Sequence, residues 1–488
     1  MLRTERAYRM GLAAILGVYL ALGTAYAWGT PLWQAPDEPA HYNYAHHIAV
    51  EGRLPVLEPG DYPAAYLEEI KAQRFPPHMP VESIRYEAHQ PPAYYLLSAA
   101  LLRLASPAPI ATQLRLLRLL SVLLGGSALV LLAGLARRLF ADRGLALSAM
   151  ALAAMTPMYI AVTAAANNDA LAFVALTAVA YRLAAPAERR WSPQNSALLG
   201  LLVGLCAVIK FQAYVAVPLV AAALFWDALV ERRLSWRQAL LSSLLVVGVA
   251  AMLALPWLAR NVAVYGYGDP LGLVRHDAVV VGQLRTADLI AEVGWRSYLL
   301  SFARTTFQSY WGQFGWMAAP LPERAYLALA VVSLLGVTGL LAGWRGRPRN
   351  GAAAWRSVIV LSAWAALTAT SFLWYNLQFV QFQGRYLFPA LPALAIALAY
   401  GLAITSRRPG WALVLLSLTA VGLLAWGLGR GDLPLYALAL CAAAALALLI
   451  IHRLPERWRW LMPLAVAAAL AALSAYSLWG IIIPLLSP

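Results

Sequence analysis

Residues 10–28 read MGLAAILGVYLALGTAYAW, an uncharged apolar run long enough to cross the roughly 30 Å hydrocarbon core of a bilayer as a helix. A few residues later, QAPDEPAHYNYAHH (residues 34–47) places two adjacent acids, Asp37 and Glu38, between prolines. Three histidines follow within the same stretch. The chain therefore sets a cluster of polar and titratable side chains at the edge of its first predicted membrane span.

The composition of the whole chain indicates a membrane protein. Of its 488 residues, 62% are hydrophobic and 12% are charged, whereas soluble domains carry about 45–50% apolar and about 25% charged residues. Runs of Ala, Leu and Val recur to the C-terminus. Because backbone polar groups in lipid must be satisfied within helices, the sequence predicts an all-α polytopic protein.

The net charge of +15 does not indicate nucleic acid as a partner. The arginines cluster in short loops between apolar runs, which is the distribution that the positive-inside rule describes. The two cysteines, Cys206 and Cys441, lie inside apolar segments and have no spacing typical of a metal site or a disulfide. We interpret them as small core residues.

The N-terminus also resembles a signal peptide, because three arginines precede the apolar run and AYA closes it. The run is longer than the 7–15 apolar residues of a signal peptide, so we predict a retained first span with the basic N-terminus in the cytoplasm. Cleavage would leave the rest of the chain on the same side.

One apolar segment, PPAYYLLSAALLRLA (residues 91–105), decides the topology. It is short for a membrane span and is more typical of an interfacial helix. If it stays outside, six basic segments all face the cytoplasm, and if it crosses, all six move outside. These segments are residues 135–144, 187–194, 231–238, 344–350, 406–410 and 452–459. We therefore predict about 13 spans, with the C-terminus outside.

This topology divides the chain into five parts. They are a first transmembrane helix (1–30), an outer loop with the acidic pair and juxtamembrane helices (31–113), spans two to seven (114–258), a second outer loop (259–325) and spans eight to thirteen (326–488). The expected location is the plasma (inner) membrane, and all the polar motifs described below are expected on its outer face.

The acidic pair has two interpretations. Asp37 precedes Pro39 and a helix-compatible stretch, so it can be an N-cap. Capping does not account for both acids beside His41. A carboxylate there can instead be a general base, and nearby lipid together with the second acid would raise its pKa.

Basic residues at the predicted outer ends of spans are a second signal, because the positive-inside rule disfavours them there. Their long side chains can snorkel to lipid head groups, or several can converge on a phosphate. Lys210 is one of two lysines in the chain. The basic residues concerned are Arg115, Arg118, Lys210, Arg260 and Arg385.

Further outer motifs can serve either structure or binding. His89 and Gln90 can donate hydrogen bonds to an anionic head group, although the prolines and Tyr94 that follow suit a helix start at the membrane interface. Asn168 and Asp169 can cap a helix. The aromatic segments 309–322 and 383–389 can form an interfacial belt or a wall for a sugar ring. The histidines show no metal-binding spacing.

In this order, the motifs resemble the GT-C glycosyltransferase superfamily, which includes the protein O-mannosyltransferases and the bacterial aminoarabinose transferases. The similarity covers roughly residues 8–275, and the chain looks like a poorly characterised bacterial branch. The matching segments are the acidic pair, HQPPAYYLL (89–97), RLLSVL (118–123), ARRLFADR (136–143), NNDA (167–170), GLLVGLCAVIKFQ (200–212) and LPWLARNVAVYGYGDP (255–270).

The resemblance implies an enzyme that moves a sugar, with inversion, from a polyprenyl phosphate to a hydroxyl on a glycan, lipid or protein. It implies Asp37 as the base, supported or replaced by Glu38, and needs no metal, although one is possible. The lysine that the family places before the two prolines is Gln90 here, so other groups must hold the donor phosphate. The expected phosphate-binding residues are Arg118, Lys210, Arg385, His89 and Gln90, and the expected substrate-binding residues are His41, Tyr94, Asn168, Asp169, Arg260 and Tyr386.

Two alternatives remain open at this point: a flippase or transporter of lipid-linked glycans, and a glycan polymerase. A transporter would use the same basic residues to hold a phosphate without chemistry. It predicts charged side chains deep within the spans along a path.

Overall fold

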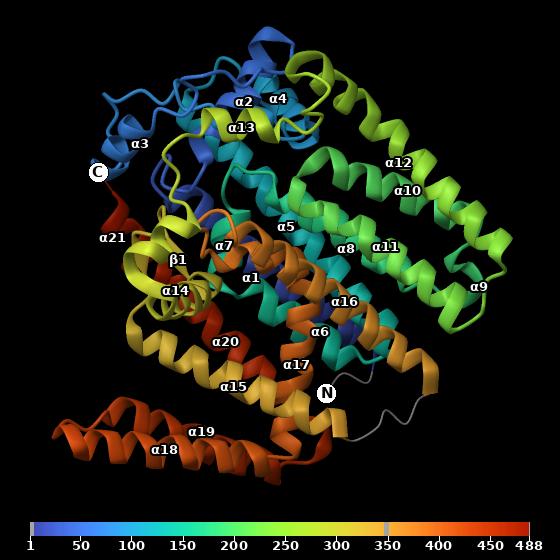
Figure 1. Ribbon diagram of the computed structural model, residues 1–488. Coiled ribbons are helices and arrows are strands. Elements are labelled where there is room, and N and C mark those ends of the chain that lie inside the picture. Colours follow the sequence, from blue (N-terminus) through green and yellow to red (C-terminus); the bar gives the residue numbers. More distant parts are fainter. Residues whose placement is uncertain (1–3, 346–350, 488) are drawn as a thin grey trace.

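The structure is a computed structural model that describes residues 4–345 and 351–487. Within these ranges, ten helical segments are long and apolar enough to cross a membrane. They are α1 (Glu5–Gly29), α5 (Ile110–Phe140), η2, α11 and η3 together (Phe211–Val230), α12 (Trp236–Tyr265), α15 (Glu323–Arg345, apolar over Glu323–Gly343), α16 (Gly351–Asn376, apolar over Val358–Asn376), η4 with α17 (Gly384–Arg407), α18 (Gly410–Arg430), α19 (Leu435–Arg453), and α20, η6 and α21 together (Leu461–Leu486). Figure 1 shows most of them gathered into one tilted bundle, with the α18–α19 hairpin lying beside it.

Three further predicted spans are shorter or broken in the structure. The helices α6 (Arg143–Ala154) and α7 (Pro157–Thr163) form one bent pair with an angle of 68°. The bend follows from Pro157, which begins a new helix. The other two, α8 (Asp169–Leu183) and α10 (Pro193–Ile209), have 15 and 17 residues. A polytopic helical protein is therefore confirmed, and the count of 13 stays a prediction.

The segment 31–113 carries its own small core at one end of the bundle (Figure 1). It contains α2 (Glu38–Glu51), α3 (Ala64–Ala72), η1 (Tyr86–His89) and α4 (Ala93–Leu104). α4 has 12 residues, so it is about 18 Å long and too short to cross the bilayer core. Arg103 at its end donates to the backbone oxygens of Ile48 and Ala49, at 3.0 and 2.9 Å, and so ties α4 alongside α2.

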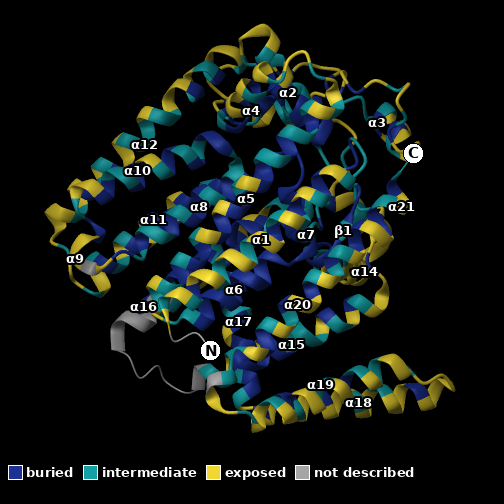
Figure 2. Cartoon of the chain, turned by 180° about the vertical axis from the view of Figure 1, so that it is seen from behind, coloured by how far each residue is buried: buried dark blue, intermediate teal, exposed yellow. Residues whose placement is uncertain are grey.

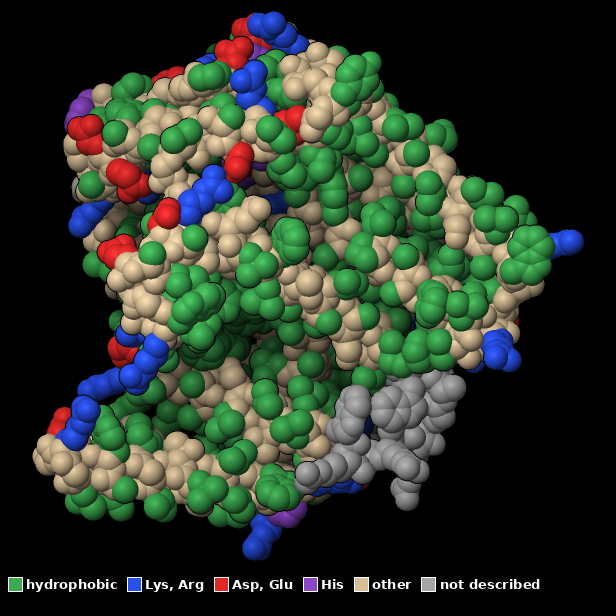
Figure 3. Space-filling model, in the orientation of Figure 1, with side chains coloured by type: hydrophobic (Ala, Val, Ile, Leu, Met, Phe, Trp, Pro, Cys, Tyr) green, Lys and Arg blue, Asp and Glu red, His purple; other side chains and the backbone are tan. Residues whose placement is uncertain are grey.

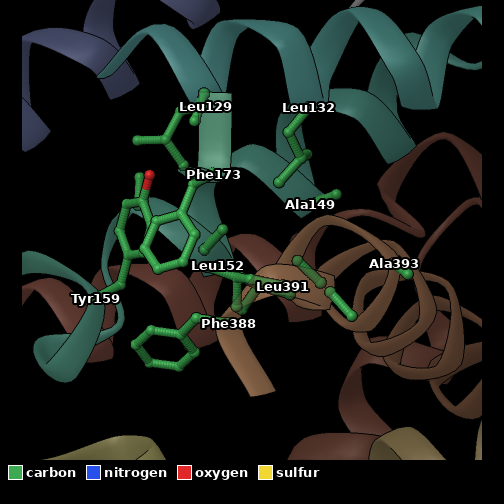
Figure 4. Close-up of a cluster of buried hydrophobic side chains, with 14 of the residues drawn as sticks. Leu129, Leu132, Ala149, Leu152, Tyr159, Phe173, Phe388, Leu391 and Ala393 are labelled. Atoms are coloured by element: carbon green, nitrogen blue, oxygen red, sulfur yellow. The ribbon is translucent and has the colours of Figure 1, made fainter. Parts of the chain in front are cut away.

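The main core lies where α5, α6, α8 and α17 (Leu391–Arg407) meet. Figure 4 shows its apolar side chains from these helices, with Tyr159 and Phe388 closing one side. Close packing depends on small residues where helices cross, as is usual in membranes. A Cβ on Gly339 of α15 would lie 1.8 Å from the backbone oxygen of Gly401 on α17. The two helices therefore meet backbone to backbone at this point.

The remaining elements cap the bundle or stand beside it. The helical hairpin of α18 and α19 is mostly exposed along its length (Figure 2). The other elements are α9 (Ala187–Arg190), η2 (Phe211–Val215), α11 (Ala216–Phe225), η3 (Trp226–Val230), α13 (Leu273–Val279), α14 (Thr286–Trp311), β1 (Gln313–Phe314), β2 (Ala319–Pro320), η4 (Gly384–Ala390), η5 (Glu456–Trp458), α20 (Leu461–Tyr476), η6 (Ser477–Ile482) and α21 (Ile483–Leu486). β1 and β2 pair antiparallel.

The polar motifs and the basic segments lie at opposite ends of the bundle. Charged side chains gather over α2, α3 and α13 at one end, and the helices beyond present a broad hydrophobic surface (Figure 3). At the other end, Arg137 and Arg143 bond Glu5, and Arg459 bonds Asp142. The two chain termini also lie at different ends (Figure 1). The predicted basic segment 344–350 lies largely outside the described residues.

This separation gives a test of the predicted sides of the membrane. In a background in which Cys206 and Cys441 are replaced, a cysteine at the exposed position Arg53 should react with an impermeant thiol reagent added to intact cells. A cysteine at the exposed position Arg408 should react only after the membrane is opened. The reverse pattern would invert the topology and move the candidate site described below to the cytoplasm.

Candidate active site

Asp37 lies where the chain turns from α1 into α2. Its φ of 66° is in the left-handed region, which Asp and Asn tolerate better than other residues with a side chain. Although it stands at the N-cap position, its side chain makes no capping hydrogen bond. Its carboxylate instead accepts from the Tyr86 hydroxyl at 2.8 Å and from Arg385 Nη2 at 2.9 Å. The capping interpretation therefore does not explain this acid.

Glu38 points in a different direction from Asp37. Its carboxylate and the Arg118 guanidinium are both fully buried and form a two-point pair, with Nε–Oε1 and Nη2–Oε2 distances of 2.8 and 2.6 Å. The remaining Arg118 donors bond the backbone oxygens of Ala27, Thr30 and Pro31. All of its hydrogen-bonding capacity is used within the chain. The geometry thus favours a structural role for the pair, which joins α5 to the turn between α1 and α2.

The segment QGRYLFP forms the turn η4, which brings Arg385 to Asp37 from 348 positions along the chain. Gly384 is needed there, since a Cβ would lie 2.2 Å from the backbone oxygen of Thr306 on α14. The Gly384 amide also donates to the Ser309 hydroxyl at 2.7 Å. Tyr386 follows, and its ring centroid lies 5.6 Å from the Arg385 guanidinium. α14 and η4 together therefore fix Arg385 beside the acid.

A second ion pair lies in the same region. Lys210, at the end of α10, donates to Asp169 at the start of α8 at 2.8 Å. Asn168 Nδ2 bonds the Ile209 backbone oxygen at 3.1 Å and the Gln90 side-chain oxygen at 3.5 Å. The side chains of Arg118, Lys210 and Arg385 are 0%, 12% and 8% exposed. Snorkelling into lipid head groups does not describe these three residues.

The other predicted site residues differ in what their side chains contact. His41 is buried and shares a 2.8 Å hydrogen bond with the Tyr95 hydroxyl. Tyr94 lies 3.3 Å from the Ser121 hydroxyl, facing α5. The His89 ring lies against Phe211 and His276. Arg260 is turned toward the segment 31–113, where it bonds the backbone oxygens of residues 54 and 55.

The electrostatics of Asp37 correct one expectation. Burial raises the pKa of Asp37, but the opposing charge of Arg385 and the Tyr86 hydrogen bond outweigh it, so the pKa is held below its ordinary value. The expected rise is therefore wrong, because it did not include an arginine from a distant segment. Burial lowers the pKa of His41 to about 4 and holds that of His89 well below its ordinary range. Both imidazoles are neutral at pH 7.

Sequence reasoning missed two neighbours, Tyr86 and Glu87, which directly precede the predicted HQPP motif. Burial first, and then the charge of Asp37, raise the pKa of Glu87 to about 8. A tyrosine and an acid just before a helix-starting Pro-Pro pair carry no recognisable pattern. The signal available was position alone, since η1 ends at His89, the first residue of the predicted motif.

Several buried polar atoms around Asp37 have no hydrogen-bond partner within residues 4–345 and 351–487. Buried polar atoms in proteins are nearly always paired, so each unpaired one marks strain or a missing ligand or water. Grouped around one set of ion pairs, they indicate a place where polar groups of a substrate can bind. The atoms are Gln34 Nε2, Glu87 Oε2, Asn168 Oδ1, Gln283 Oε1, Gln383 Oε1 and Arg385 Nε.

Two cavities adjoin this region. The first, about 30 Å³, is lined by Gln34, Asn167, Arg385 and apolar residues of α7 and α21. It has room for one or two water molecules. The second, about 250 Å³, lies in the segment 31–113 beside Tyr44, with His47, Arg53 and Arg85 among its lining residues. With the Asp37–Arg385 pair formed, the Asp37 side chain is still 29% exposed, so the acid is not sealed from solvent.

Known proteins resemble this chain in sequence over part of its length and in fold over nearly all of it. Residues 89–259 match the family model of dolichyl-phosphate-mannose-protein mannosyltransferase. The fold is similar to ArnT from Cupriavidus metallidurans bound to undecaprenyl phosphate, with a TM-score of 0.53 and 16% identity over 96% of this chain and 77% of that one. The chain has the GT-C fold. The predicted helical membrane fold class is thus confirmed. The family model covers residues 89–259, so its match supports the predicted superfamily and the enzyme class of membrane glycosyltransferases over that part of the chain.

A second GT-C relative has the same arrangement of helices. The oligosaccharyltransferase of Archaeoglobus fulgidus, tethered to an acceptor peptide, matches with a TM-score of 0.55 and 12% identity. The match covers 96% of this chain and 55% of that one, so the chain spans about half the length of the archaeal protein. The same archaeal enzyme in complex with dolichol-phosphate gives a TM-score of 0.50 at 14% identity, over 94% of this chain and 56% of that one. No curated protein sequence matches the chain.

Proposed function

We propose that this GT-C protein transfers a sugar from a polyprenyl-phosphate donor to a hydroxyl acceptor on the outer face of the membrane, with inversion. Asp37 is the general base. Arg385 and Lys210 hold the donor phosphate and stabilise the charge that grows on it as it leaves. The Glu38–Arg118 pair fixes the turn that carries Asp37. Among the solved GT-C proteins, complexes with undecaprenyl phosphate and dolichol-phosphate support this class of donor.

The reaction needs one proton transfer and one displacement. The Asp37 carboxylate takes the proton of the acceptor hydroxyl, whose oxygen attacks the anomeric carbon from the side opposite the phosphate. The bond between that carbon and the phosphate oxygen breaks, and the polyprenyl phosphate leaves with the bonding electron pair. Positive groups placed where this charge develops commonly provide the largest catalytic contribution. Among the described residues, no three His, Cys, Asp or Glu side chains are grouped to hold a metal ion.

The observation that carries this proposal is the pairing of Asp37 with Arg385. The acid sits in a left-handed backbone conformation with no capping role, 2.9 Å from an arginine that can also bond a phosphate. When the donor binds, Arg385 can turn to the phosphate and leave Asp37 free to accept a proton. The Lys210–Asp169 pair and the unpaired polar atoms lie around the same acid.

The transporter alternative has less support from the charged residues of the spans. A transporter needs polar side chains along a path between the two ends. Asp227 is buried, but it is paired with Arg190 and Arg356 at the end of the bundle away from Asp37. The core between the two ends, drawn in Figure 4, is formed by apolar side chains.

Purified protein in vesicles, supplied with polyprenyl-phosphate sugars and hydroxyl acceptors, should release polyprenyl phosphate together with a glycosylated product. A transporter would move the donor across the bilayer and leave its sugar–phosphate bond intact. Movement of intact donor with no release of polyprenyl phosphate would therefore contradict the proposal.

Arg385→Gln should weaken donor binding more than it slows chemistry on bound donor. A hydrogen bond to a charged group contributes about 1.5–3 kcal/mol, so we expect KM for the donor to rise roughly 10- to 100-fold. Steady-state kinetics over a range of donor concentrations measure this change. Arg138→Gln, at the other end of the bundle where the side chain bonds Tyr181, is the control and should leave KM unchanged. An unchanged KM in Arg385→Gln would remove Arg385 from the phosphate site.

A further inference from the structure

Glu87 is the one carboxyl group of this region that has no cationic partner within hydrogen-bond distance in the described chain. It lies on η1, next to Tyr86, which bonds Asp37. Its Oε2 atom is buried and has no hydrogen-bond partner among the described residues. An ionised carboxylate oxygen buried without a donor is costly, whereas a protonated carboxyl can itself donate a hydrogen bond.

The charged side chains near Glu87 suggest what a protonated Glu87 can do. Asp37 is paired with Arg385, and Asp169 is paired with Lys210. The charges within each pair cancel, so an ionised Glu87 would leave this group of side chains with a net negative charge. The proposed donor is itself anionic at its phosphate, and the charge on that phosphate grows as it leaves. A neutral Glu87 removes a repulsion that would otherwise oppose both donor binding and departure of the phosphate.

We propose that Glu87 acts as a protonated carboxyl group, whose Oε2–H donates a hydrogen bond to a phosphate oxygen of the bound donor. This inference rests on the proposed function and makes Glu87 a positioning and binding residue beside the base Asp37. Glu87 thereby becomes a third hydrogen-bond donor for the phosphate, after Arg385 and Lys210, and it carries no positive charge. Deprotonation of Glu87 removes that donor and adds a like charge at the same place.

The groups that face Glu87 explain why its proton is retained. Burial is the largest cause of the raised pKa, to about 8, and Asp37 at the start of α2 adds to it, as does Asp169 on α8. Lys210 and a hydrogen bond from Gln90 act in the opposite direction. Tyr86, Tyr95 and Tyr375, from η1, α4 and α16, also interact with Glu87. Burial raises the pKa of Tyr86 and of Tyr95, so both are neutral at pH 7. Because the pKa is raised, the donor-competent form is present below about pH 8 and is lost above it.

The test is the pH dependence of donor binding in wild type and in Glu87→Gln. Glutamine has nearly the shape of the protonated acid, donates a hydrogen bond and does not ionise in this range. Wild-type KM for the sugar donor should be about tenfold higher at pH 9 than at pH 7, since only the protonated fraction binds well. Glu87→Gln should keep wild-type KM at pH 7 within about threefold and lose the rise. Glu82→Gln, on an exposed position of the same loop, is the control and should keep the wild-type profile.

Four results would overturn the inference. One is a loss of kcat by a hundredfold or more in Glu87→Gln at pH 7, which would mean that the ionised form is required. Another is a rise in KM with pH that persists in Glu87→Gln. The third is a wild-type KM that does not change between pH 7 and 9. Glu87→Leu removes the donor, so its KM should be raised at every pH, and an unchanged KM in this variant would also contradict the inference.

A second readout separates this inference from the proposed function. Binding of undecaprenyl phosphate can be measured without any transfer between pH 7.5 and 9.5, where both phosphate protons are already lost because the second pKa of a phosphate monoester is about 6. If wild type transfers no sugar but binds this lipid less tightly as pH rises, and Glu87→Gln does not, the proposed reaction fails and the role of Glu87 stands. If wild type transfers sugar but its lipid binding does not change with pH, the role of Glu87 fails and the reaction stands.

Discussion

Asp37→Asn should reduce sugar transfer by roughly 10²–10⁴-fold, which is the usual contribution of general acid–base catalysis. Asparagine keeps the size of the side chain and tolerates the left-handed backbone of this position. Its amide oxygen can still accept from Arg385, and its amide nitrogen can donate to the Tyr86 hydroxyl. It removes the basicity. Transfer measured in vesicles at saturating donor, with expression and the unfolding midpoint checked alongside, tests the role of the acid.

The control for this substitution is Asp277→Asn. Asp277 also lies near an arginine, with 3.5 Å between its Oδ2 and Arg285 Nη2, but this pair is largely exposed on α13. Transfer by this variant should stay close to wild type. If Asp37→Asn transfers sugar at a near-normal rate, Asp37 is not the base. If Asp37→Asn does not accumulate as folded protein, Asp37 has a structural role, although its side chain makes no capping hydrogen bond.

The state of Asp37 also predicts the acid side of the pH profile. Arg385 and Tyr86 hold its pKa below the ordinary value of a carboxyl group, despite the opposing effect of burial. Asp37 therefore stays ionised down to a lower pH than an ordinary aspartate does. The pairing with Arg385 belongs to the donor-free enzyme, whose titration is reported by kcat/KM. Titration of Asp37 should therefore not reduce kcat/KM between about pH 5 and 7, and any loss in that range must come from another group.

Much of the fold followed from the sequence because the bilayer allows few solutions. Long apolar runs separated by basic segments indicate helices that cross the membrane, and the short run before Arg103 was interpreted as an interfacial helix. The described α4 has 12 residues and lies alongside α2. The bend between α6 and α7 and the short α8 were not predicted. The bend follows from Pro157 at the start of α7. The start of α8 is fixed by Asp169, which pairs with Lys210 at the end of α10.

The site was predictable in its parts but not in its pairings. The sequence placed Asp37, Lys210, Asp169 and Arg385 on one face, and the structure brings these residues into two neighbouring ion pairs. It could not show that Arg385 reaches Asp37 across 348 positions, or that Arg118 turns away to Glu38. Pairings between distant segments depend on three-dimensional packing. Local patterns such as an acid before a proline suggest capping equally well.

Arg118→Met should lower stability by about 3–5 kcal/mol, since it removes one partner of a buried ion pair and leaves the Glu38 charge without its cation. It also leaves the backbone oxygens of Ala27, Thr30 and Pro31 without these donors. The unfolding midpoint in detergent, together with the yield of folded protein, measures the loss. Arg115→Met is the control, because Arg115 is one turn earlier on α5, partly exposed and over the Trp28 ring.

The double variant Glu38→Gln with Arg118→Met decides between a structural pair and a phosphate site. If the two residues act as a structural pair, the double variant should be more stable than Arg118→Met alone, because no buried charge remains unpaired. Its transfer activity should recover with its folding, since Asp37 and Arg385 are intact. The sequence-based alternative assigns Arg118 to the donor phosphate and predicts the opposite: Arg118→Met folds normally and has a raised donor KM that Glu38→Gln does not correct. The five hydrogen bonds that Arg118 already makes to Glu38 and to the three backbone oxygens are the reason we expect the structural result.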